Sequence, residues 1–146
     1  MAAIAIPNGS TVYLDANIFI YAAEIPNAHP KLLDLLQRLD QGELSSVTSI
    51  LTLDEVLVVP IRLDDTKLQN AYKDRIRNGP SLTVLDISRS ILIKAAELRA
   101  ATKSIKLPDA IHACTCMSTA CNFYLTNDLR LKAVFGLPVV TLADLA

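Results

Sequence analysis

The chain contains no tryptophan, and aromatic residues make up only 5% of its 146 residues. Its hydrophobic fraction is nevertheless 51%, so the core has to be built from Leu, Ile, Val and Ala. This composition excludes a disordered chain and is typical of a layered α/β protein. The length predicts one domain over residues 1–146.

Long apolar runs are also missing. No stretch approaches the roughly 18 apolar residues that a membrane-spanning helix requires. The apolar start at residues 1–7 is short and has no Lys or Arg, which argues against a signal peptide. We therefore expect a cytoplasmic protein.

Cysteine is scarce, with three residues confined to positions 114, 116 and 121. They are too few for a disulfide framework. A zinc site would combine them with His112, but residues two apart on a helix point about 200° apart. We therefore expect buried free thiols.

The four glycines, at positions 9, 42, 79 and 136, form no phosphate-binding loop, and a Gly-x-Ser-x-Gly elbow is missing. The net charge of −1 gives no overall basic field. Residues 1–72, however, hold four Lys/Arg and nine Asp/Glu, whereas residues 73–132 hold ten and five. This asymmetry is compatible with an ordinary solvated surface or with a face that binds an anion.

Short apolar runs alternate with helical patterns along the chain. We expect strands at 11–14, 44–49, 82–85, 123–126 and 139–141. We expect helices at 17–23, 30–39, 50–61, 66–77, 89–102, 108–120 and 129–134, with Ser88 capping the fifth. The alternation predicts an α/β fold with a central parallel sheet between two helical layers.

Four carboxylates fall where such a sheet would place a ligand. Asp15 ends the first strand, and Asp128 follows the strand at 123–126 by two residues. Asp109 lies in the first turn of a helix, and Glu55 lies near the start of another. Because ligands bind beyond the carboxyl ends of parallel strands, all four side chains can converge there.

Converging carboxylates repel one another, and a divalent cation removes that repulsion. Their hard oxygen ligands suit Mg²⁺ or Mn²⁺, which can activate water for phosphodiester hydrolysis. Each acid also has an ordinary structural interpretation. Asp109 could stabilise its helix, Asp128 could be an N-cap and Asp15 a turn residue. Glu55 could be solvated, as we expect for Asp54.

Four motifs resemble those of the PIN-domain ribonuclease family. Tyr13–Tyr21 (YLDANIFIY) resembles the opening motif, and Thr52–Val56 (TLDEV) fits the second, with Glu55 as its acid. Leu107–Ala113 (LPDAIHA) resembles the third acidic motif, and Leu125–Asp128 (LTND) resembles the closing Thr-x-Asp motif. Their order and spacing agree from Thr11 to Val140.

The resemblance implies a three-layer α/β/α fold and Mg²⁺- or Mn²⁺-dependent ribonuclease activity. It is strongest to the VapC-like toxins of type II toxin–antitoxin pairs, which implies an antitoxin partner. The positions of Asp15 and Asp109 correspond to metal ligands, and Glu55 and Asp128 complete the acidic cluster. Asn17 and Thr126 correspond to polar positions that orient the carboxylates or a water.

Two other classes of protein fit less well. Phospho-receivers and haloacid-dehalogenase-like phosphatases carry a second acid close to the first strand, whereas Ala16 and Asn17 follow Asp15 here. A non-catalytic PIN-fold adaptor is expected to have lost one of the four acids. We expect His112 to lie on a helix surface or behind an acid rather than to act as a general base.

An RNA substrate requires cations beside the acids. The candidates are Lys103, Lys106, Arg130 and Lys132, which are close in sequence to Asp109 and Asp128. Arg130 is the strongest of them because it begins a short helix, whose amino end favours anions. The resemblance and a mean hydropathy of +0.35 also predict a homodimer.

Overall fold

The computed structural model describes residues 3–146, so Met1 and Ala2 at the apolar start lie outside the description. Five strands were found, namely β1 Thr11–Leu14, β2 Ser45–Ser49, β3 Leu82–Leu85, β4 Phe123–Thr126 and β5 Val139–Thr141. The helices are α1 Ala16–Glu24, α2 Pro30–Asp40, α3 Leu51–Arg62, α4 Thr66–Arg75, α5 Arg89–Ala101 and α6 Leu107–Ser118. Single 3₁₀ turns occur at η1 Pro26–Ala28, η2 Leu129–Ala133 and η3 Leu142–Asp144.

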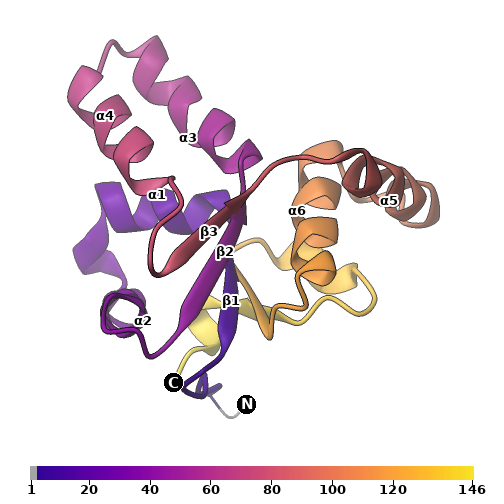
Figure 1. Ribbon diagram of the computed structural model, residues 1–146, viewed down its shortest axis with the longest axis horizontal. Coiled ribbons are helices and arrows are strands. Elements are labelled where there is room, and N and C mark those ends of the chain that lie inside the picture. The colour runs from indigo at the N-terminus through magenta and orange to yellow at the C-terminus, as the bar shows by residue number, and fades with distance from the viewer. Residues whose placement is uncertain (1–2) are drawn as a thin grey trace.

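The strands form one sheet in the order β3-β2-β1-β4-β5, and every neighbouring pair is parallel. Helices α1 to α4 cover one face of this sheet, and α5 and α6 cover the other (Figure 1). This arrangement confirms the predicted three-layer α/β/α fold. None of the helices within residues 3–146 is long and apolar enough to cross a membrane.

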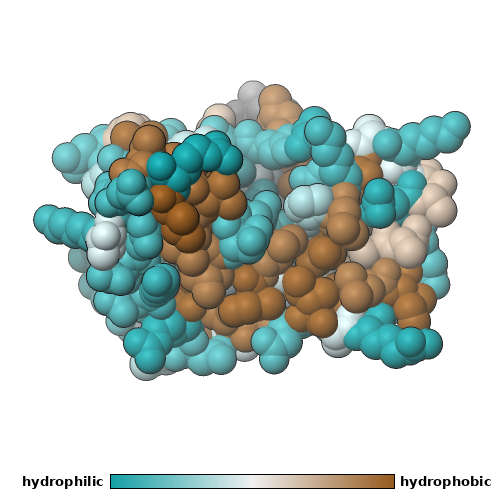
Figure 2. All heavy atoms as spheres, turned by 90° about the horizontal axis from the view of Figure 1, so that it is seen from above, coloured by the Kyte–Doolittle hydropathy of each residue, from teal (hydrophilic) through white to brown (hydrophobic). Residues whose placement is uncertain are grey.

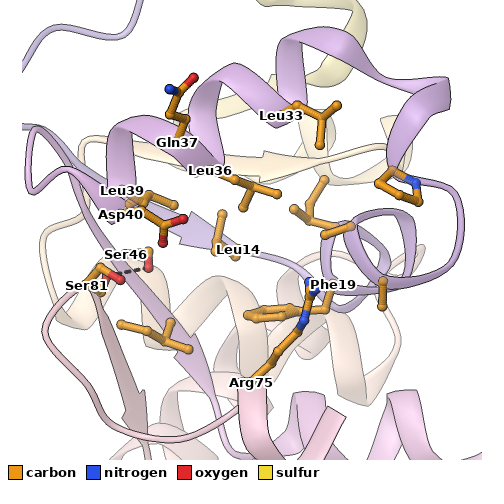
Figure 3. A pocket seen from close by; sticks show the side chains of 15 residues that line it. Leu14, Phe19, Leu33, Leu36, Gln37, Leu39, Asp40, Ser46, Arg75 and Ser81 are labelled. Atoms are coloured by element: carbon orange, nitrogen blue, oxygen red, sulfur yellow. Dashed lines mark hydrogen bonds between the residues drawn. The ribbon is translucent and has the colours of Figure 1, made fainter. Parts of the chain in front are cut away.

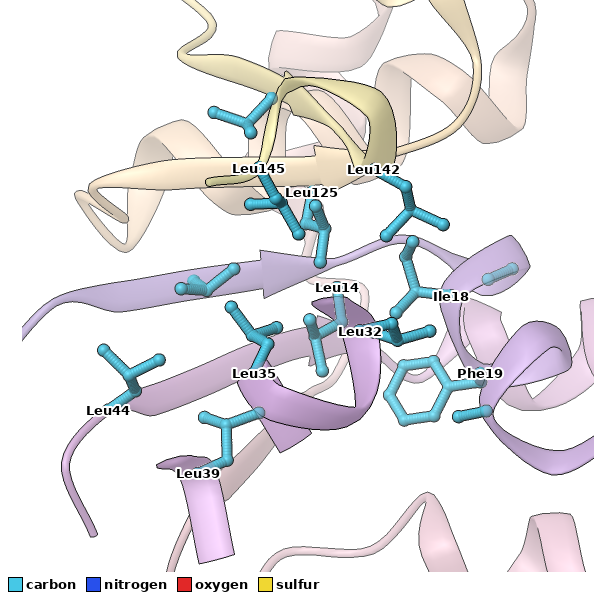
Figure 4. Packing of buried hydrophobic residues seen from close by; sticks show 14 of the residues in the cluster. Leu14, Ile18, Phe19, Leu32, Leu35, Leu39, Leu44, Leu125, Leu142 and Leu145 are labelled. Atoms are coloured by element: carbon cyan, nitrogen blue, oxygen red, sulfur yellow. The ribbon is translucent and has the colours of Figure 1, made fainter. Parts of the chain in front are cut away.

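Alternation along the central strand divides the core in two. Val12 and Leu14 pack into the cluster formed with α1 and α2, which Figure 4 shows from close by. Tyr13, between them in sequence, packs into the cluster beneath α5 and α6. This is the two-residue period of a strand that is buried on both faces. Leu14 therefore anchors one helical layer while the hydroxyl of Tyr13 is directed into the other.

The predicted elements agree closely with the observed ones. The strands at 82–85, 123–126 and 139–141 have the predicted bounds, and Ser88 caps α5 by accepting a 3.2 Å hydrogen bond from the amide of Ile91. The segment 129–134 is a 3₁₀ turn rather than an α-helix. The three cysteines are buried and free, as predicted.

Candidate acidic active site

Asp15 lies where the strand order reverses, between β1 and β4, which is the usual ligand position in an open parallel sheet. It is buried and caps α1, because its Oδ1 accepts a 2.8 Å hydrogen bond from the amide of Ala16. Its Oδ2 accepts a 2.7 Å hydrogen bond from Thr126 Oγ1 at the end of β4. The carboxylate is thus held by two separate elements at the carboxyl edge of the sheet.

Asn17 and Thr126 form a polar frame around this carboxylate. Asn17 Nδ2 donates to Thr126 Oγ1 at 3.2 Å and to Asp15 Oδ2 at 3.5 Å. The amide of Asp128 donates to the same Thr126 hydroxyl at 3.0 Å. Thr126 therefore connects Asp15 directly to the backbone that carries Asp128.

Glu55 reaches the site from α3 and contacts His112 of α6. His112 Nε2 lies 2.5 Å from Glu55 Oε1 and 3.9 Å from Asp15 Oδ1. The histidine is only 2% exposed, so a helix-surface position for it is wrong, whereas a position behind an acid is observed. Asp54, the neighbour of Glu55, is exposed as expected.

Burial raises the pKa of Asp15, and His112 and the Thr126 hydrogen bond oppose that shift. The charge of Glu55 raises the pKa of Asp15 further, which indicates that the two carboxylates share one electrostatic environment. A cation at this position would stabilise the ionised form of Asp15.

Asp109 and Asp128 share Arg130. Its guanidinium donates to both oxygens of Asp128, with an Nη2–Oδ2 distance of 2.6 Å, and Nη2 lies 3.6 Å from Asp109 Oδ2. These bonds lower the pKa of Asp128, which keeps it ionised. Asp128 also caps η2, and Asp109 Oδ2 accepts from the amide of Lys106 at 3.3 Å. The ordinary structural roles foreseen for both acids therefore coexist with their place in the cluster.

The site thus consists of two acid pairs, with Asp15 and Glu55 both near Nε2 of His112 and with Asp109 and Asp128 beside Arg130. Within residues 3–146, no three Asp, Glu, His or Cys side chains close around one point to form a complete metal cage. The donors still fit Mg²⁺ or Mn²⁺, because such ions bind carboxylate oxygens and keep several waters. Arg130 shows that a positive charge is accommodated between the acids.

The cationic candidates differ in their surroundings. Arg130 is committed to Asp128, and Lys132 Nζ lies 3.4 Å from Asp144 Oδ2. Lys103 and Lys106 are exposed between α5 and α6 and form no ion pair with any residue in the described range 3–146. Of the four candidates, these two lysines are therefore the most accessible to a phosphate.

A separate groove of about 600 Å³ lies on the side of the sheet that α1 and α2 cover. Leu14, Phe19 and Leu36 line it, and Asp40 and Arg75 add charges (Figure 3). None of the four candidate acids lines this groove, so it is distinct from the acidic site.

Tyr13 is the residue whose contribution the sequence did not reveal. Its hydroxyl contacts His112 Nδ1 at 2.6 Å. A signal was present, because a tyrosine on a doubly buried strand needs a partner for its hydroxyl. The identity of that partner depended on the position of α6 relative to β1.

Comparison with known proteins places these observations in a family context. The profile of the PIN domain matches residues 12–136. No curated protein matches the sequence.

Solved structures with similar folds were found as well. VapBC2 from Rickettsia felis, solved bound to a promoter DNA fragment, has a TM-score of 0.71 at 20% identity, covering 90% of this chain and 98% of the other. FitAcB from Neisseria gonorrhoeae has a TM-score of 0.71 at 19% identity, covering 92% of this chain and 99% of the other. VapC20 from Mycobacterium tuberculosis, a sarcin-ricin loop cleaving toxin, has a TM-score of 0.68 at 16% identity, covering 85% of this chain and 95% of the other. At these identities the similarity shows the fold.

Proposed function

This chain belongs to the PIN domain family, and we propose that it is a metal-dependent endoribonuclease that acts as the toxin of a toxin–antitoxin pair in the cytoplasm. The observation that carries the proposal is the acidic site at the carboxyl edge of the sheet, where Asp15, Glu55, Asp109 and Asp128 are all retained. The folds of VapBC2 and VapC20 support the toxin assignment.

In this proposal, Asp15 and Asp109 would hold Mg²⁺ or Mn²⁺, and Glu55 and Asp128 would complete the negative site. When bound, the cation supplies an activated water and stabilises the charge that develops on the phosphate. Thr126 keeps Asp15 Oδ2 in place through its 2.7 Å hydrogen bond. Asn17 restrains both of these residues, so that the carboxylate is oriented before a cation or RNA arrives.

A non-catalytic adaptor and a phosphoryl-transfer enzyme are the alternatives. An adaptor does not need four acids at the same edge, and the phosphoryl-transfer enzymes considered carry a second acid close to the first, where Ala16 and Asn17 stand here. The retained acidic set therefore favours a nuclease.

The test uses a matched pair on one helix. Glu55→Gln removes an acid of the site, whereas Asp54→Asn removes the exposed acid next to it. We expect the wild type and Asp54→Asn to cleave single-stranded RNA with Mg²⁺ or Mn²⁺, and Glu55→Gln to lose most of this activity. DNA of the same sequence should remain intact. Equal cleavage by all three preparations would indicate a contaminating nuclease and would remove the support for the proposal.

A second prediction concerns how RNA is held. Each phosphate contact to Lys103, Lys106, Arg130 or Lys132 should contribute about 0.7 to the slope of log K against log salt for a single strand. Alanine variants should lower that slope and weaken binding regardless of RNA sequence. Lys103 and Lys106 should show the clearest effect, because Arg130 and Lys132 have internal acidic partners.

Binding would be measured over a salt series in an inactive Asp15→Asn background, with a short RNA. Lys67→Ala on α4 serves as a control, because this exposed residue belongs to the helical layer on the other face of the sheet from α5 and α6. Unchanged slopes for all four variants would locate the RNA path elsewhere.

A third prediction concerns self-association. Exposed apolar side chains gather at the end of α3, where Val58 (44% exposed) and Ile61 (53%) lie three residues apart on one face, and Val59 (54%) and Leu63 (71%) lie four apart on the neighbouring face. Figure 2 shows extensive apolar areas on the face seen from above. Since a monomer rarely exposes a large contiguous apolar patch, we expect a homodimer that buries this region.

Light scattering at tens of micromolar should give the dimer mass for the wild type. Ile61→Asp should shift the protein toward monomer, whereas Leu92→Asp on α5 should leave the dimer intact. A wild-type protein that is purely monomeric at this concentration would contradict the prediction.

The partner in the pair is proposed to be an antitoxin, since one structural neighbour is a toxin–antitoxin complex and another belongs to a family of toxin–antitoxin systems. The apolar groove of Figure 3 offers such a protein a surface separate from the acidic site. A short neighbouring reading frame whose product copurifies with this chain and blocks its RNA cleavage would support this assignment.

A further inference from the structure

A buried polar chain lies behind the acidic site and connects three elements to Glu55. The amide of Ser49, at the end of β2, donates to Tyr13 Oη at 3.1 Å. Tyr13 Oη lies 2.6 Å from His112 Nδ1, and His112 Nε2 lies 2.5 Å from Glu55 Oε1. Tyr13 is fully buried and His112 is 2% exposed, so water does not offer alternative partners.

Aromatic packing fixes the rings of Tyr13 and His112. The ring of Tyr13 is stacked on Tyr124, with centroids 4.9 Å apart and planes at 9°. His112 meets Tyr13 edge-on, with centroids 5.7 Å apart and an angle of 72°. Neither ring can turn without breaking the close packing of the hydrophobic cluster beneath α5 and α6.

The positions of the hydrogen atoms in this series of hydrogen bonds can be assigned from the geometry. The Tyr13 hydroxyl accepts the hydrogen of the Ser49 amide, and its own hydrogen has to point at a second partner. His112 Nδ1 is 2.6 Å from the hydroxyl oxygen, closer than the Ser49 amide nitrogen, and we assign Nδ1 as the acceptor. In a neutral imidazole the remaining ring hydrogen is then on Nε2, where it faces Glu55.

We propose that Tyr13 and His112 are positioning residues that hold the Glu55 carboxylate through a fixed Nε2–H tautomer of His112. A glutamate side chain is flexible, and holding it in advance removes the cost of ordering it when a ligand binds. In this arrangement His112 donates to Glu55 and has no free nitrogen to accept a proton from water. The inference rests on the proposed function in one respect only, namely that Glu55 belongs to a metal-binding nuclease site.

The tautomer can be measured without metal or RNA. The chain has only two histidines, so ¹⁵N-histidine labelling with a His29→Asn variant assigns the signals of His112. Long-range ¹H–¹⁵N correlation should show a single neutral Nε2–H tautomer in the wild type. Tyr13→Phe should replace it with a mixture of states, because Nδ1 loses the donor that fixes it. A wild-type Nδ1–H tautomer, or a charged ring, would overturn the proposal, and that spectrum decides the matter even if Tyr13→Phe does not fold.

A second measurement tests the positioning itself. His112→Gln keeps a donor for Glu55, whereas His112→Leu has none. Residues that orient a metal ligand typically contribute about 10-fold or more to metal affinity. We therefore expect calorimetric Mn²⁺ affinity to fall about 10-fold in His112→Leu and distinctly less in His112→Gln, provided that melting curves show both to be folded. Equal affinities for all three proteins would overturn the positioning role. A wild type with the expected tautomer but no Mn²⁺ binding would instead contradict the proposed metal-dependent function.

Discussion

Asp15→Asn and Asp109→Asn are each expected to reduce RNA cleavage by about 10³-fold or more, because losing a metal ligand removes several kcal/mol of transition-state stabilisation. The same substitutions should leave the melting temperature unchanged or raise it. Loss of activity together with retained stability distinguishes a functional carboxylate from one that only supports the fold.

The stability expectation for Asp15 follows from the direction of its pKa shift. Burial raises the pKa of Asp15, so folding favours its protonated form. This contribution to stability is present at low pH and is lost as the pH rises from the ordinary carboxyl range through the raised pKa. At neutral pH the ionised group opposes folding, and Asn removes the charge while remaining a good N-cap for α1.

Melting curves and cleavage rates measured on the same preparations test this prediction. A stabilisation of about 1 kcal/mol would appear as a rise of about 2–4 °C in a domain of this size. Asp34→Asn, an exposed acid on α2, should change neither quantity. Either site variant cleaving RNA at the wild-type rate would contradict the assignment of its carboxylate.

Sequence patterns were sufficient for the fold because each strand is a short apolar run. Leu82–Leu85 and Phe123–Thr126 have the predicted bounds, since β-type residues end abruptly at both sides. The segment after Asp128 was less predictable. Its five residues form only a 3₁₀ turn, because so short a segment gains little from forming an α-helix.

The acidic site was predictable to the level of its residues but not of its contacts. Topology alone places Asp15 and Asp128 at one edge of the sheet, because β1 and β4 are parallel neighbours. The pairing of Arg130 with Asp128 and Asp109 depends on side-chain conformations that no spacing specifies. The same holds for His112, which belongs to a helix whose buried face was not evident from its sequence.

Removing divalent metal is expected to abolish RNA cleavage, and adding Mg²⁺ or Mn²⁺ in excess over the chelator should restore it. The reason is that four carboxylates gather at one site, and Arg130 counterbalances the negative charge of only two of them, Asp109 and Asp128. Asp15 and Glu55 have only His112 as a possible ion-pair partner among the described residues. Full activity in excess EDTA would exclude a metal-dependent mechanism.

Binding of the cation should also be visible without RNA. A ligand at 100 times its Kd stabilises the folded state by about 2.7 kcal/mol, which corresponds to a rise of about 5–10 °C in the melting temperature. The rise should be lost in Asp15→Asn and Asp109→Asn and kept in Asp54→Asn, which changes the net charge equally but lies outside the site. If the metal-induced rise persisted in a protein carrying both site substitutions, the cation would bind elsewhere and these two carboxylates would not be its ligands.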